Sequence, residues 1–131
     1  MINKIFLVLA FIMILTPASK IFATDWKLVA HSDENDVNTF VDNDSIVNNG
    51  DIYNFWMFHD FKGKSEYQGK KIQRTTAYTV VNCKTNKINY KEIILEWTDG
   101  ETQKSTPTLE DETVKEGTVS EGVLNYICNR Q

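Results

Sequence analysis

The residues of this 131-residue chain with the most constrained chemistry are its two cysteines. Cys83 ends a run rich in Thr, Tyr and Val, and Cys128 lies three residues before the last residue. Two cysteines in a small exported domain indicate a disulfide. Free buried thiols are an alternative, and so is a redox pair, although such pairs usually lie in a Cys-X-X-Cys motif, which this sequence lacks. We expect Cys83 and Cys128 to be bonded.

No spacing of histidines or carboxylates predicts a metal site. His31 and His59 are the two histidines, and zinc sites usually need three or four ligands. A calcium loop needs Asp at alternate positions, a Gly and a distant Glu, and the acidic residues in 33–44 do not follow that order. We expect these carboxylates to lie in turns and to be solvated: Asp33, Glu34, Asp36, Asp42 and Asp44.

A further group of carboxylates, Glu96, Asp99 and Glu101, could act as an acid/base pair, but nothing in the sequence supplies a pocket for it. The Gly-x-Ser-x-Gly motif, the phosphate loop and the dinucleotide fingerprint are absent. We therefore expect no enzymatic activity, no catalytic residue, no metal and no cofactor.

The first 23 residues have the organisation of a secretory signal. Lys4 supplies the positive charge, Ile5–Leu15 is an unbroken apolar run, and the more polar stretch after it ends on Ala23. The apolar run is shorter than the about 20 residues that a membrane span needs. We predict cleavage after Ala23, with an uncleaved anchor as the alternative.

Cleavage there would leave residues 24–131 as one domain, large enough for one modest core. No cysteine lies near the cleavage site, so no lipid anchor is expected. We expect the domain in the periplasm, at the cell surface or secreted, without stable membrane insertion.

Positive charge is concentrated in residues 62–91, where eight basic residues face one acid, Glu66. The rest of the predicted mature domain is strongly acidic. A sulfated glycan or an acidic protein patch could dock on such a segment; the alternative is that the charges are solvated and discourage edge-to-edge strand pairing. No nucleic-acid partner is expected. The candidate ligand-binding residues are Lys70, Lys71, Arg74, Lys84 and Lys87.

Alternating apolar and polar residues predict the strands that would position these groups. In the first of them, Trp26, Leu28 and Ala30 alternate on one face. Asn49-Gly50 and Asp99-Gly100 are hairpin signals, and residues 62–71 are expected to form a solvated connection. The predicted strands are Asp25–His31, Val37–Val41, Ile52–Phe61, Ile72–Cys83, Lys87–Trp97 and a short edge strand, Glu101–Ser105.

The strand that ends on Cys83 has one small, apolar face, which suits a helix packed on it. That face carries Thr75, Ala77, Thr79, Val81 and Cys83. In contrast, Ile52–Phe61 has aromatic residues on both faces, so we expect both of its faces to be partly covered.

A C-terminal helix is predicted after a crossing loop at Thr106–Gly117. Thr118 and Glu121 have the spacing of a capping box, and the apolar residues that follow recur at helical intervals. A helix of about ten residues is marginal alone, and Gly122 costs it about 1 kcal/mol relative to Ala. It therefore needs the sheet beneath it, and a link from Cys128 to Cys83 would hold it there.

Four stretches of the sequence resemble the surface-adhesin protein E domain family of bacterial envelope proteins. The cysteine positions carry the resemblance most strongly, and it extends over nearly all of residues 24–131. The chain departs from the family pattern at Asn82, where Asp is usual, and it lacks a lipobox cysteine and the Trp common before the terminal helix. The stretches are Trp26, Phe40–Ile46, Val80–Lys84, and Gly117-Thr118 with Tyr126–Cys128.

The resemblance implies an α+β fold: an antiparallel sheet of about six strands with a C-terminal helix tethered to one face by a disulfide. It also implies a non-enzymatic, host-facing adhesin that binds extracellular-matrix or plasma proteins. The missing lipobox favours an alternative, a periplasmic structural or accessory protein with no host ligand. The sequence predicts no particular oligomeric state.

Overall fold

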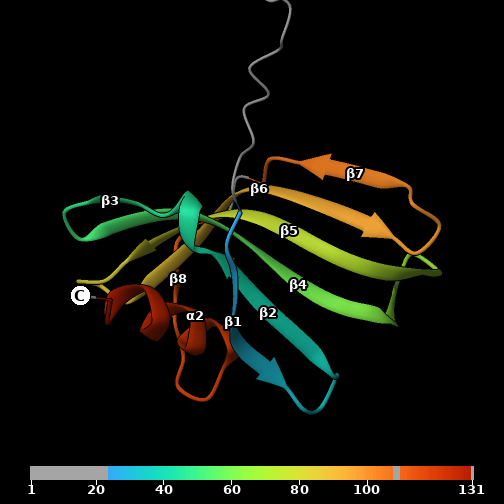
Figure 1. Cartoon of the computed structure of the whole chain (residues 1–131), viewed down its shortest axis with the longest axis horizontal. Helices are drawn as coiled ribbons and strands as arrows, with labels where there is room; N and C mark the ends of the chain where they lie inside the picture. Colours follow the sequence, from blue (N-terminus) through green and yellow to red (C-terminus); the bar gives the residue numbers. More distant parts are fainter. Residues whose placement is uncertain (1–23, 108–109, 131) are drawn as a thin grey trace, which may run out of the picture.

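The computed structural model describes residues 24–107 and 110–130, so the predicted signal segment lies outside the described residues. The described part is an antiparallel sheet of eight strands with one α-helix on one face (Figure 1). The strands are β1 (Trp26–Ser32), β2 (Val37–Asp42), β3 (Val47–Asn49), β4 (Ile52–Tyr67), β5 (Lys70–Asn82), β6 (Lys87–Trp97), β7 (Thr102–Ser105) and β8 (Glu112–Thr113); η2 (Asn43–Ser45) and α2 (Val119–Cys128) complete the elements.

The sheet follows the order β1-β2-β4-β5-β6-β7, with every neighbour antiparallel. β3 pairs with β4 beyond the end of β2, and β8 pairs with β6 beyond the end of β7. The expectation of about six strands is therefore too low. The two additional strands have three and two residues, too short to show an alternating pattern in the sequence.

The connection expected at residues 62–71 is instead mostly strand. β4 continues to Tyr67 and β5 begins at Lys70, so the long hairpin closes through Gln68 and Gly69. Both turn residues have positive φ, 53° and 77°, as a two-residue type I′ turn requires. A register shift between Asp60 and Ser65 interrupts the pairing and hides the strand pattern in the sequence.

A bulge in β1 places Leu28 and Ala30 on opposite faces of the sheet, whereas the sequence predicts that they share one face. Leu28 lies opposite Phe40, but Ala30 lies opposite Thr39, so the alternation shifts by one residue between them. Ala30 therefore points toward α2 while Leu28 points away from it. The consequence is a close approach: a Cβ added to Gly122 of α2 would lie 3.1 Å from the Ala30 Cβ and 3.3 Å from the Val29 carbonyl oxygen.

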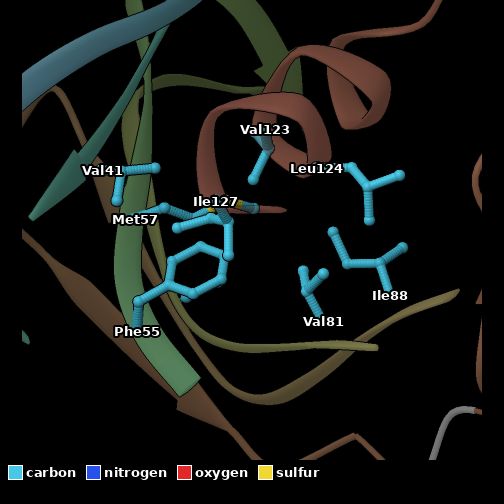
Figure 2. Packing of buried hydrophobic residues seen from close by; sticks show 9 residues of the cluster. Val41, Phe55, Met57, Val81, Ile88, Val123, Leu124 and Ile127 are labelled. Carbon is cyan, nitrogen blue, oxygen red and sulfur yellow. The ribbon is translucent and has the colours of Figure 1, made fainter. Parts of the chain in front are cut away.

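The core lies between α2 and the sheet face that we call the helix face, which carries Val41, Phe55, Met57, Ala77 and Val81 (Figure 2). From the helix, Val123, Leu124 and Ile127 pack onto it, and Val123 and Ile127 are 0% exposed. The predicted small, apolar face of β5 is thus the one under the helix. Burial of aliphatic side chains is the main source of stability here.

Both ends of α2 are fixed. The Thr118 Oγ1 accepts the Glu121 N–H at 3.2 Å, which confirms the predicted cap, while the Glu121 carboxylate accepts the Gly117 N–H at 3.4 Å. At the other end a disulfide joins Cys128 to Cys83, with 5.6 Å between the Cα atoms. The expected disulfide and its role as a helix tether are confirmed.

Candidate functional site

The histidines are separate from each other and have local partners. The His31 Nε2 lies 3.1 Å from the Asp33 carboxylate at an exposed site, whereas the His59 Nδ1 lies 2.7 Å from the buried Thr39 hydroxyl. Burial lowers the pKa of His59, because the charged imidazolium loses hydration. Among the described residues no three His, Cys, Asp or Glu side chains are placed to hold a metal ion.

The carboxylates considered as an acid/base pair each contact a cation of β5 instead. Glu96 lies 3.3 Å from the Arg74 guanidinium, and Lys70 lies 2.9 Å from Asp99 and 2.6 Å from Glu101. The hydrogen bonds that Lys70 donates lower the pKa of Asp99, and because Glu101 and Asp99 accept them, the pKa of Lys70 is raised. These contacts indicate a surface ion network.

Ion pairs also neutralise the start of the basic segment. Lys62 lies 2.9 Å from Asp36, and Lys64 contacts the other oxygen of the same carboxylate. These hydrogen bonds, from Lys64 first and Lys62 second, lower the pKa of Asp36 to about 2. The positive run seen in the sequence is therefore partly cancelled in space by acids from elsewhere in the chain.

The five candidate basic residues do not form one patch. Lys70, Lys71 and Arg74 lie near the start of β5, while Lys84 and Lys87 follow its end. Arg74 and Lys84 are ten positions apart in mostly extended chain, so the two groups are separated by roughly 30 Å. Lys71, Lys84 and Lys87 are exposed, and none of them has an ion pair within the described part of the chain.

The sheet face opposite α2 has a different composition, and we call it the open face. Phe58 is at its centre, with its ring 4.7 Å from Phe40 in a stacked arrangement and 4.7 Å from Trp26 edge-on. The Arg74 guanidinium lies over the same ring at 4.9 Å. No described helix covers this face, and its aromatic residues are only partly buried.

A groove of about 620 Å³ opens next to this cluster. Trp56 and Tyr78, cross-strand partners in β4 and β5, form an aromatic pair with ring centroids 5.1 Å apart. Most of the other lining residues come from the turn after β2 and from β6. The lining residues are Thr24, Asp42, Asp44, Ser45, Trp56, Tyr78 and Glu92.

Local structure explains how this groove is held open. The Asp42 Oδ1 accepts the N–H groups of Asp25 and Asp44, at 2.9 and 3.1 Å, which fixes the turn η2. The Ser45 Oγ accepts the Trp56 N–H at 2.8 Å and so joins η2 to β4. These bonds position a carboxylate-rich turn directly beside the Trp56 ring.

This groove was not predicted from the sequence. Aromatic residues on both faces of β4 were the available signal, and Trp56 and Phe58 do lie opposite Phe55 and Met57. Trp56 pairs with Tyr78, and Tyr78 pairs with Glu92, through the β4–β5–β6 register, which a single sequence does not reveal. No helix in the described residues is long and apolar enough to cross a membrane.

One family model matches this chain. The family model described as "Surface-adhesin protein E" matches residues 26–129. The crystal structure of protein E from non-typeable Haemophilus influenzae is similar to this chain with a TM-score of 0.50 and 15% identity, over 88% of this chain and 82% of that one. At that identity the likeness is one of fold. No curated protein sequence matches the chain.

Proposed function

The chain belongs to the surface-adhesin protein E family, and from this premise we propose that it is an exported binding module that contacts a host extracellular-matrix or plasma protein without catalysing a reaction. The observation that carries the proposal is the open face. Contiguous, partly exposed aromatic surface of this kind marks interaction sites in soluble proteins. Aromatic residues and Arg are also the residue types enriched at protein interfaces.

Binding to a panel of immobilised matrix and plasma proteins tests the proposal, with two matched variants of the exported domain. Leu28 on the open face is 57% exposed, and Tyr67 at the far end of the β4–β5 hairpin is 49% exposed. Leu28→Ser should weaken binding about fivefold, because burial of the remaining leucine surface contributes about 1 kcal/mol. Tyr67→Ser should leave it unchanged.

Two results would contradict the proposal. The panel as a whole could fail to bind the folded domain, or Tyr67→Ser could weaken binding as much as Leu28→Ser does. The alternative is a periplasmic accessory protein with no host ligand. Protease treatment of intact cells separates the two, because a surface protein is cleaved while a periplasmic one is protected until the outer membrane is opened.

We propose the exposed lysines as a second contact, for an anionic glycan. What favours it is that Lys84 and Lys87 are exposed and free of ion pairs in the described residues, whereas Lys70 and Arg74 are neutralised. A heparin column compares Lys84→Ser/Lys87→Ser with Lys70→Ser/Arg74→Ser, which removes two paired cations. The Lys84→Ser/Lys87→Ser variant should elute at lower salt than the wild type. A wild type that is not retained at low salt rules this contact out.

A further inference from the structure

We infer that the groove beside Trp56 receives a lysine or arginine side chain of the bound partner protein. The inference rests on the proposed function for the partner being a protein, and it adds the chemical group that is recognised. Two features of the groove carry it, an aromatic floor and a carboxylate rim. The third observation is the pattern of cation contacts elsewhere in the domain.

The floor is the Trp56–Tyr78 pair, with ring centroids 5.1 Å apart and ring planes tilted by 44°. Both side chains are partly buried, so their rings are held by the sheet while part of each remains accessible. A Lys or Arg head group within about 6 Å of such rings is attracted by the negative face of the π system, and Trp gives the strongest attraction.

The rim is acidic. Asp42, Asp44 and Glu92 line the groove, and no lysine or arginine of the described residues does. Asp42 is 6% exposed, and within the described residues only its Oδ1 has hydrogen-bond partners, so Oδ2 is left to accept another donor. The exposed Asp44 carboxylate has no ion pair in the same part of the chain, and Glu92 has one, to Lys104 at 3.0 Å.

At two other places in the domain an aromatic ring lies near carboxylates. At both, a lysine or arginine of the domain itself contacts the ring and the carboxylates. Arg74 lies over Phe58 and pairs with Glu96, while Lys70 lies 4.7 Å from the Trp97 ring centre and pairs with Asp99 and Glu101. At the groove the same combination occurs, but among the described residues no cation lies over Trp56 or Tyr78. A cation from a partner fits that position.

The probe is a synthetic peptide, acetyl-Gly-Lys-Gly-Lys-Gly-amide, titrated into the exported domain and followed by the NMR signals of the indole N–H groups. The Trp56 signal should shift and saturate, while the buried Trp97 signal stays in place. Acetylation of both lysines removes the charge and should abolish the shift. Added salt should weaken binding, because part of the attraction is between exposed charges.

Two carboxylates of β6 provide a matched pair of variants. Glu92→Gln and Glu96→Gln each remove one ion pair on the open face, but only Glu92 lines the groove. Glu92→Gln should raise the Kd of the peptide about threefold, and Glu96→Gln should leave it unchanged. Trp56→Leu should also raise the Kd of the peptide about threefold. Its circular dichroism spectrum should match that of the wild type, which would show that the fold is kept.

The inference is overturned if the Trp56 signal does not move, if the acetylated peptide binds as well as the charged one, or if Glu96→Gln has the same effect as Glu92→Gln. A shift caused instead by a neutral oligosaccharide would show that the groove recognises a glycan. Host-protein binding with no peptide effect would refute this inference and leave the proposed function standing. A peptide effect without host-protein binding would refute the proposed function and leave a cation groove.

Discussion

Loss of the Cys83–Cys128 bond should lower the free energy of unfolding by about 4 kcal/mol. The two residues are 45 positions apart, and the chain-entropy model gives about this value for a loop of that length. Domains of this size are stable by only about 5–15 kcal/mol, so the loss is a large fraction of the total. The effect should be strongest for α2, because a ten-residue helix is marginal without its tether.

Urea denaturation of Cys83→Ala/Cys128→Ala, followed by tryptophan fluorescence, measures this loss. The reduced wild-type domain is the matched control, since it lacks the bond but keeps both sulfur atoms and thus separates the crosslink from side-chain packing. Hydrogen exchange should show the α2 amides losing protection before those of β4 and β5. A loss below about 1 kcal/mol in both proteins would refute the entropy argument.

Three further perturbations have defined outcomes. Gly122→Ala should lower the urea midpoint despite the better helix propensity of Ala, because the new Cβ would lie 3.1 Å from Ala30, whereas the exposed Asn125→Ala should not lower it. Thr118→Ala should cost about 1 kcal/mol by removing the cap to the Glu121 N–H, and Thr118→Ser should restore most of it; equal midpoints would contradict this. The lowered pKa of His59 means that the unfolded chain binds a proton more readily than the folded one, so stability should fall as pH decreases through 6.5. His59→Gln should flatten the dependence of the urea midpoint on pH in that window, and an unchanged slope would contradict the burial argument.

Local patterns in the sequence were sufficient for most of the fold. Residue types at short spacings predict the face of β5 under the helix and the Thr118 cap. The disulfide was predicted from two cysteines in a domain that is expected to be exported. The missed features depend on longer-range pairing or on single residues. β3 and β8 pair with the parts of β4 and β6 that β2 and β7 leave unpaired. The bulge at Val29 moves Ala30 to the helix face, and the local composition does not indicate it.

The site was harder to predict for a related reason. Charge along a sequence does not report charge in space, since Asp36 comes from outside the basic segment to pair with Lys62, and Asp99 pairs with Lys70 in the same way. The groove likewise combines β2, β4, β5 and β6 through their register. The family resemblance was confirmed by the match over residues 26–129, but a family match does not identify contact residues.

The two faces of the sheet allow stability and binding to be tested independently. The helix face contains the fully buried side chains, Phe55 and Val81 among them, and the disulfide adjoins it. On the open face Trp56 and Phe58 are only partly buried, so truncating them removes less packing than truncating Phe55 would. A loss of ligand binding in an open-face variant with an unchanged urea midpoint can therefore be assigned to the surface itself.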